Sequence, residues 1–164
     1  MKNCTIRIPL IIVILLYNVV LFAQTTEESY YPTNEIRNRT DSIFSKTPCY
    51  WEFRSIPNNY VVQDYEVDGK NHRAKYRNNE LEIGVGEHRF YISKEYFEND
   101  IDYDYSKDFI LRFIDFEGFS AKTNELKFFL SINKPETDWS YHIYFFIKLD
   151  GTSRVVFPTF EDDY

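Results

Sequence analysis

Cysteine is nearly absent from this sequence of 164 residues, so a disulfide framework is excluded. Cys4 lies in the apolar first stretch of the chain, which leaves Cys49 as the only cysteine of the part that follows. Cys49 alternates with Trp51 and Phe53, as residues on one face of a strand do. We therefore expect Cys49 to be a buried, unreactive thiol.

Glycine and histidine are also scarce, with five glycines and three histidines. The chain contains no glycine-rich phosphate-binding loop and no G-x-S-x-G nucleophile motif. Its histidines form no H-E-x-x-H or H-x-H pair of the kind that binds zinc. No motif therefore points to a catalytic residue or to a bound cofactor, and the sequence favours a non-catalytic protein.

Basic residues are outnumbered, since 19 Lys and Arg face 26 Asp and Glu, for a formal net charge of −7. A chain with this excess of acid repels phosphate backbones and anionic lipid. We therefore do not expect nucleic acid as a partner.

Residues 1–23 have the pattern of a secretory signal peptide. Lys2 and Arg7 precede an apolar run of 15 residues, from Ile8 to Phe22, and the small residue Ala23 follows it. A membrane span needs about 20 residues, so we expect cleavage after Ala23, and retention as an N-terminal anchor is the alternative. Cleavage would remove two basic and no acidic residues, which leaves 141 residues with a net charge of −9. The sequence thus predicts a secreted or periplasmic protein with no stable membrane span.

The mature chain is expected to begin with a flexible polar segment, residues 24–32, followed by a single β-rich domain, residues 33–164. Within residues 33–46, Ile36, Ile43 and Phe44 fall on one side at helical spacing. This spacing predicts a short N-terminal helix, whose apolar stripe must pack on the sheet because so short a helix is unstable alone.

The clearest strand pattern lies in residues 125–157, where alternate positions are apolar and are expected to share one face of a strand: Trp139, Tyr141, Ile143, Phe145, Ile147 and Leu149. Asp150-Gly151 and Asp68-Gly69 suit two-residue hairpin turns. Residues 57–59 and 78–79 are expected to be turns as well, and residues 93–98 contain one helical turn. The expected strands span residues 50–56, 60–67, 70–77, 81–85, 88–92, 109–116, 125–133, 139–149 and 152–157.

The sequence therefore predicts a mainly β (α+β) fold, in which an antiparallel meander forms a sandwich or a partly open barrel with the N-terminal helix packed on it. Residues 109–116 are apolar at positions of both faces, which suits a central strand or a buried helix. Their β-branched and aromatic content favours the strand.

Two-residue turns would pair Tyr65 with His72, Asp64 with Arg73 and Ile147 with Arg154. The reverse face of residues 139–149 would then carry His142, Tyr144 and Phe146, and something should cover it: the helix, a second sheet, a ligand or another chain. The candidate ligand or partner contacts are Tyr65, His72, His142, Tyr144 and Phe146. Further tyrosines lie outside core-like positions and suit a contact surface: Tyr30, Tyr31, Tyr60, Tyr103 and Tyr105.

Acidic residues at alternate positions, Asp100, Asp102 and Asp104, with Asp108 further on, make a candidate Ca²⁺ site. They resemble the first, third and fifth positions of an EF-hand loop, although Tyr105 stands where the glycine belongs and Leu111 where the closing glutamate belongs. A solvated acidic loop is the competing interpretation, and it implies no cofactor.

Three functions are compatible with these patterns. The first is an exported, non-catalytic binding protein that contacts a protein or an envelope component. The second is a barrel-like carrier of a small apolar ligand, which predicts an enclosed aromatic cavity. The third is a hydrolase that uses carboxylates near residues 100–108.

Overall fold

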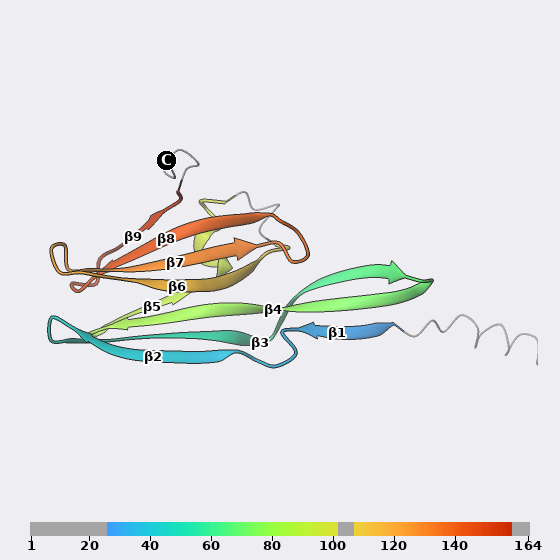
Figure 1. Cartoon of the computed structure of the whole chain (residues 1–164), viewed down its shortest axis with the longest axis horizontal. Coiled ribbons are helices and arrows are strands. Elements are labelled where there is room, and N and C mark those ends of the chain that lie inside the picture. Colours follow the sequence, from blue (N-terminus) through green and yellow to red (C-terminus); the bar gives the residue numbers. More distant parts are fainter. Residues whose placement is uncertain (1–25, 102–106, 159–164) are drawn as a thin grey trace, which may run out of the picture. The chain divides into compact units, whose positions relative to one another are not determined.

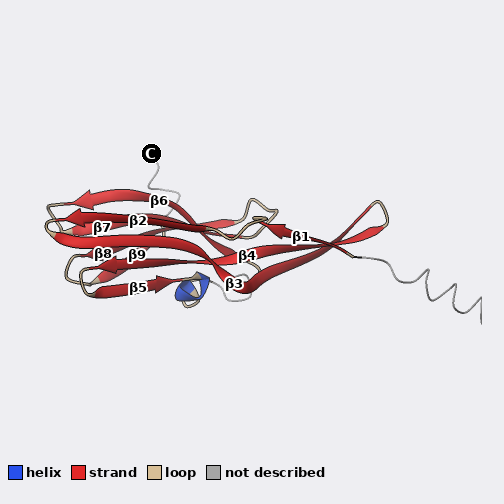
Figure 2. Cartoon of the chain, turned by 90° about the horizontal axis from the view of Figure 1, so that it is seen from below, coloured by secondary structure: helices blue, strands red, loops and turns tan. Residues whose placement is uncertain are grey.

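The computed structural model describes residues 26–101 and 107–158, so the expected signal peptide lies outside the described residues. Within these ranges the chain forms nine strands in two antiparallel sheets, with one 3₁₀ turn, η1 (Lys94–Phe97), and no α-helix (Figures 1 and 2). The predicted mainly β fold with antiparallel sheets is thereby confirmed. No helix in the described part has the length and apolar content that crossing a membrane would require.

The described residues divide into two compact units, one of residues 26–29 with 63–74, the other of residues 30–62 with 75–101 and 107–158. The first sheet has the strand order β1–β4–β3–β2, and β5 also pairs with β4. Its strands are β1 (Glu27–Tyr31), β2 (Arg37–Phe44), β3 (Thr47–Val67), β4 (Lys70–Val85) and β5 (His88–Ile92). The second sheet is a meander of β6 (Ile110–Ser120), β7 (Glu125–Asn133), β8 (Ser140–Lys148) and β9 (Ser153–Val156).

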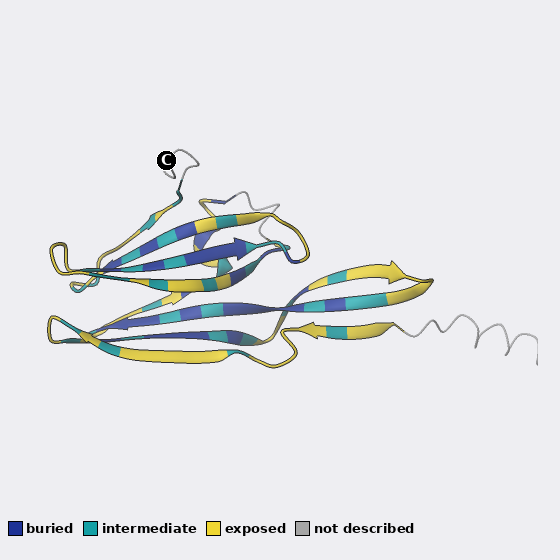
Figure 3. Cartoon of the chain, in the orientation of Figure 1, coloured by how far each residue is buried: buried dark blue, intermediate teal, exposed yellow. Residues whose placement is uncertain are grey.

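The larger unit holds its core between the two sheets, where the buried faces of the strands meet (Figure 3). On β7 and β8 the inward positions alternate as predicted, and Phe128, Phe145 and Ile147 have no exposed surface. Trp139, expected on the same face, precedes β8 and is 57% exposed. Rings from the two sheets are in contact, with Trp51 stacked on Phe116 at 4.4 Å between ring centroids. The two sheets thus pack face to face, and they form no closed barrel.

The predicted N-terminal helix is wrong, because strand β2 occupies most of residues 33–46. Ser45 and Lys46 both have positive φ, which closes a two-residue turn and lets β2 pair with β3 over eight residues. The expected apolar stripe is split between the two faces of the strand: Phe44 packs on the core, while Ile43 is 72% exposed. Pairing with β3 gives the backbone of β2 hydrogen-bond partners along its whole length. A short helix without such partners is unstable in water.

The turns expected at residues 57–59 and 78–79 are also wrong, since these residues lie inside β3 and β4. Asn58 does take a positive φ of 55°, but the strand continues beyond it. Asn78 donates a hydrogen bond to Oδ1 of Asn59 at 2.6 Å, so asparagines on the two strands bond to each other. A side chain that often makes turns here links two strands instead.

Residues 110–120 form a strand, β6, as their composition favours, and its register shifts twice. The shifts lie between Phe113 and Asp115 and between Phe116 and Gly118. They place Phe113, Phe116 and Phe119 opposite the buried Leu130, Phe128 and Leu126 of β7. Bulges therefore explain how a run that looks apolar on both faces directs its aromatic rings to one side.

The predicted register of the last hairpin is wrong by one residue. Arg154 pairs with Phe146 rather than with Ile147, and Ser153 pairs with Ile147. The loop contains four residues, Leu149–Thr152, and is closed by a hydrogen bond from Lys148 N to Thr152 O at 2.8 Å. Since one step along a strand moves every side chain to the other face, this shift brings Arg154 to the outer face.

In the smaller unit, β3 and β4 meet at the two-residue turn Asp68-Gly69, where both residues have positive φ. The contacts expected across this hairpin are present, since Asp64 and Arg73 form an ion pair at 2.7 Å. Residues 27–31, within the segment expected to be flexible, form strand β1.

Candidate ligand-binding groove

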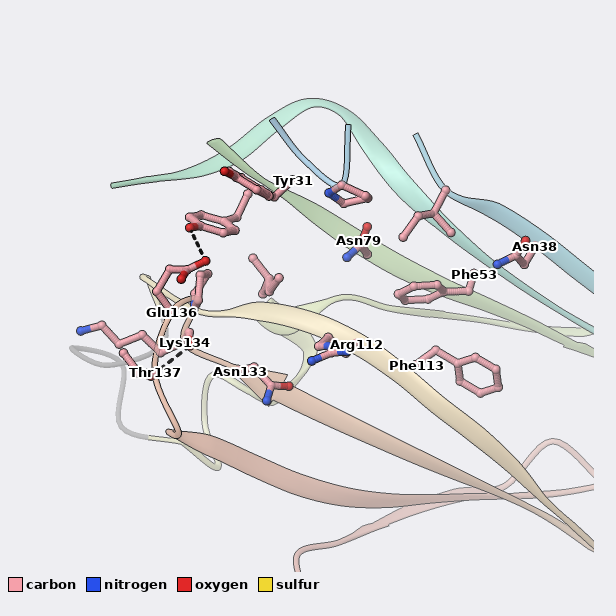
Figure 4. Close-up of a pocket in the computed structure, with 15 residues that line it drawn as sticks. Tyr31, Asn38, Phe53, Asn79, Arg112, Phe113, Asn133, Lys134, Glu136 and Thr137 are labelled. Carbon is pink, nitrogen blue, oxygen red and sulfur yellow. Dashed lines mark hydrogen bonds between the residues drawn. The ribbon is translucent and has the colours of Figure 1, made fainter. Parts of the chain in front are cut away.

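A groove of about 560 Å³ lies in the larger unit, at one edge of the two sheets (Figure 4). Tyr31, Asn38, Phe53 and Asn79 reach it from the first sheet, and Arg112, Phe113 and Asn133 reach it from the second. Its volume falls within the range of sites that take small ligands. The other lining residues are Pro32, Ile36, Tyr76, Ile110, Lys134, Pro135, Glu136 and Thr137.

Aromatic rings form much of the wall. Tyr31 stacks on Tyr76, with ring centroids 5.2 Å apart and planes 19° from parallel. The Tyr76 hydroxyl donates a hydrogen bond to Oε1 of Glu136 at 2.8 Å, which fixes the buried ring. Tyr31 is 44% exposed, so the stacked pair presents an open ring surface. Phe53 and Phe113 continue the wall, with centroids 6.0 Å apart.

A buried polar cluster holds the two sheets together behind the groove. Ser55 Oγ donates to Oδ1 of Asn79 at 3.1 Å and accepts from the backbone N–H of Ile36 at 3.1 Å. Asn79 in turn donates to the backbone carbonyl of Leu111 on β6 at 3.0 Å. Because such bonds are strong in a dry interior, they fix the spacing of the groove walls.

Arg112 is the unusual residue of the groove. Among the residues that the structure describes, its side chain has no hydrogen bond, ion pair or ring contact, whereas the side chain of every other described arginine has at least one. It projects from β6 opposite Ser131, which carries no charge. Its five N–H groups are therefore available to a ligand.

Three predicted contact residues, His142, Tyr144 and Phe146, lie together on the outer face of β8. Phe129 of β7 joins them, 5.2 Å from Tyr144 and 5.4 Å from His142 between ring centroids. This face is covered by cations: Lys127 Nζ lies 3.8 Å from the Tyr144 ring centroid. The Arg154 guanidinium lies 3.6 Å from the centroid of Phe146. Their stems shield the rings of Tyr144 and Phe146, so this part of the face has a cover of its own.

The other two predicted contacts, Tyr65 and His72, belong to the smaller unit, where their rings stack at 5.5 Å and 13°. Together with Asp64 and Arg73 they border a depression of about 370 Å³. His72 Nδ1 is 3.6 Å from a carboxylate oxygen of Glu27. The polar side chains here pair with one another, which makes this depression a weaker candidate than the groove.

The predicted calcium site lies partly outside the described residues, because these do not include Asp102 and Asp104. Asp100 is exposed, and Asp108 Oδ2 lies 3.9 Å from Lys134 Nζ. Across residues 26–101 and 107–158, no three or more His, Cys, Asp or Glu side chains gather as metal ligands. The calcium site therefore stays a prediction.

Cys49 is buried, as predicted, and burial raises the pKa of its thiol. A raised pKa lowers the fraction of thiolate at neutral pH, which makes the sulfur a poor nucleophile.

Most groove residues escape sequence reasoning. Tyr31 was expected in a contact surface, but Arg112 and Asn133 are two among several polar residues of their strands, and Asn38 lies in the segment expected to be a helix. Comparison with protein families found no model that matches the chain, and no curated protein matches it.

Proposed function

We propose that this chain is an exported, non-catalytic binding protein of the cell envelope or extracellular space, and that the groove is its ligand site. The observation that carries the proposal is the unpaired Arg112, which stands in a groove with aromatic walls. A cation without a partner beside open ring surface favours a ligand that supplies both a polar group and an apolar body.

The chemistry of the groove favours binding over catalysis. No histidine, cysteine or serine is among its described lining residues, and Glu136, its one carboxylate, accepts the hydrogen bond from Tyr76. General acid–base or nucleophilic catalysis needs paired groups within hydrogen-bond reach of one another. The hydrolase with carboxylates near residues 100–108 is an alternative that no contact of the described residues favours.

The carrier alternative expected an enclosed aromatic cavity inside a barrel. The sheets form no closed barrel, and side chains such as Phe128, Leu130 and Phe145 fill the space between them. An open groove at the sheet edge suits a ligand that remains partly in solvent.

The groove is tested by nuclear magnetic resonance on the mature chain, residues 24–164, with a library of small polar aromatic compounds. We expect some compounds to shift the backbone amides of Tyr31, Asn38, Arg112 and Asn133. An Asn38→Trp variant should block these shifts by filling the groove, and the matched control Ile43→Trp, on the exposed side of the same strand, should not. If no compound moves these amides, or if Asn38→Trp has no effect on binding, the groove is not the site.

Export is tested separately by mass spectrometry of the protein recovered from periplasmic and secreted fractions. We expect the chain to begin at Gln24 in one of these fractions. A chain that keeps residues 1–23 and sediments with membranes would contradict cleavage and support the anchor.

A further inference from the structure

We infer that the groove selects a carboxylate: a ligand whose charged end binds Arg112 and whose apolar body packs on the aromatic wall formed by Tyr31, Phe53 and Phe113. This inference rests on the proposed function and names the chemical class of its ligand.

Three side-chain oxygens of the groove already accept a hydrogen bond from this chain. Asn79 Oδ1 accepts from Ser55, and Asn133 Oδ1 accepts from the Ser131 hydroxyl at 2.6 Å. Glu136 Oε1 accepts from Tyr76. The donors are largely free, since all five N–H groups of Arg112 lack a partner among the described residues, and Asn133 keeps both hydrogens of its amide nitrogen. A donor-rich groove suits a ligand rich in acceptors.

The charge of the groove favours an anion. Its described lining includes two cations, Arg112 and Lys134, and one anion, Glu136, in a chain whose net charge is −7. Lys134 lies 3.9 Å from Asp108, and Glu136 is bound to Tyr76, so Arg112 is the cation that no carboxylate neutralises. On β7, the residue opposite Arg112 is Ser131, and the next acid along β6, Asp115, follows the first bulge.

The shape of the groove fits a carboxylate joined to an apolar body. Arg112 and Phe113 are consecutive on the edge strand β6, so their side chains leave opposite faces of the strand, and both border the groove at this edge, with Phe53 across from Phe113 (Figure 4). A guanidinium presents two parallel N–H groups to a carboxylate, which fixes its orientation as well as its charge. The rings of Phe53 and Tyr31 then offer apolar surface to the rest of the ligand.

The test uses a matched pair of probes, 3-phenylpropanoate and its neutral amide 3-phenylpropanamide, titrated into the mature chain. We expect the acid to bind about tenfold more tightly than the amide, because only the acid forms a charged pair with Arg112. The Arg112→Gln variant should remove this preference while leaving the affinity for the amide within about twofold. The control Arg89→Gln, at an exposed site on β5, should leave both affinities unchanged.

A second matched pair separates the two sources of such a carboxylate. The peptide Gly-Gly-Gly-Phe is compared with its C-terminal amide, so that preference for the free peptide indicates recognition of a chain terminus. Preference for 3-phenylpropanoate alone indicates a free small acid. Thermal melts of Arg112→Gln should match those of the parent protein, because the side chain is exposed and unpaired.

Four outcomes are distinguishable. Preference for either acid that Arg112→Gln abolishes supports the inference. Equal binding of acid and amide in both pairs, with shifts confined to groove amides, overturns the choice of a carboxylate but leaves the groove as a binding site. If neither acid binds while neutral library compounds shift the groove amides, carboxylate selection is again overturned. If no compound of any kind moves them, the proposed function fails as well.

Discussion

The outer faces of the two sheets in the larger unit are held by different interactions between side chains. On the first sheet, the buried Glu52 carboxylate lies 2.8 Å from Arg37, 3.6 Å from Arg54 and 3.7 Å from Arg39. Arg54 also reaches Glu80 on β4 at 2.7 Å, so ion pairs link three strands. On the second sheet, cations lie over aromatic rings instead.

The difference shows that an outward apolar row need not be a binding surface. The reverse face of β8 was expected to need a cover from another part of the chain, a ligand or a partner. Lys127 and Arg154 supply that cover from the neighbouring strands. Arg112, whose side chain has no ion-pair partner among the described residues, lies at the edge of the sheets. The proposed site lies at this edge for that reason.

The largest effect is expected from Gly84→Ala on the first sheet. A Cβ atom at Gly84 would lie 2.1 Å from Cε1 of Tyr50, so the ring must move and lose its hydrogen bond to Glu82. We expect the free energy of unfolding to fall by about 2–3 kcal/mol, as measured by urea denaturation. In a Tyr50→Ala background the same substitution should cost much less. Equal costs in the two backgrounds would show that the ring is not the cause.

Removing the central charge of the first sheet tests the ion-pair network. Glu52→Gln keeps the shape of the side chain but weakens its bonds to three arginines, and we expect a loss of about 1–2 kcal/mol in unfolding free energy. Glu87→Gln, an exposed acid in the turn between β4 and β5, is the matched control and should change stability by less than about 0.5 kcal/mol. Equal effects would mean that Glu52 contributes no more than a solvated acid.

The corresponding change on the second sheet is Lys127→Met, which keeps an apolar stem over Tyr144 and removes the cation. We expect a loss of about 0.5–1 kcal/mol. Lys127 also lies 3.5 Å from Glu117, so Glu117→Gln measures the ion pair alone. If Glu117→Gln lowers the free energy of unfolding as much as Lys127→Met does, the contact between Lys127 and the Tyr144 ring contributes nothing beyond the ion pair.

The smallest effect concerns acid pH. The hydrogen bond from Arg154 lowers the pKa of Glu125 below its ordinary value of about 4.3. A lowered folded pKa stabilises the fold above the unfolded pKa, and this contribution is lost as pH falls through the folded value. In Arg154→Gln we expect the pKa of Glu125 to rise and this part of the acid destabilisation to shrink. The pKa of the Glu125 carboxyl is measured in both proteins by carbon-detected magnetic resonance. An equal pKa in the parent protein and in Arg154→Gln would show that Arg154 does not lower it.

The sequence correctly predicted the elements that are determined by residues close together in the chain. Asp68-Gly69 indicated a hairpin with the correct cross-strand contacts, and alternation on β8 indicated the buried face correctly. Predictions failed where pairing with a distant strand decides the outcome. Residues 37–44 carry weak helical spacing, but their partner β3 makes them a strand.

The groove could not be predicted from the sequence, because its main feature is that no described acidic side chain pairs with Arg112. Arg112 is an ordinary arginine in the sequence, and it becomes distinctive only because the fold places Ser131 opposite it. The missed residue Asn79 looked like part of a turn, yet it joins β4 to β6 through the carbonyl of Leu111. Such roles depend on contacts between residues that lie 19 and 32 positions apart in the chain.

The two interruptions of β6 also govern what can be added to the second sheet. A strand that docked along its open border would find the regular spacing of amide and carbonyl groups broken twice within 11 residues. Only short stretches could be matched before the ladder failed, so stacking of copies into fibres through this border is disfavoured. The same irregularity that turns three phenylalanines inward therefore limits uncontrolled growth.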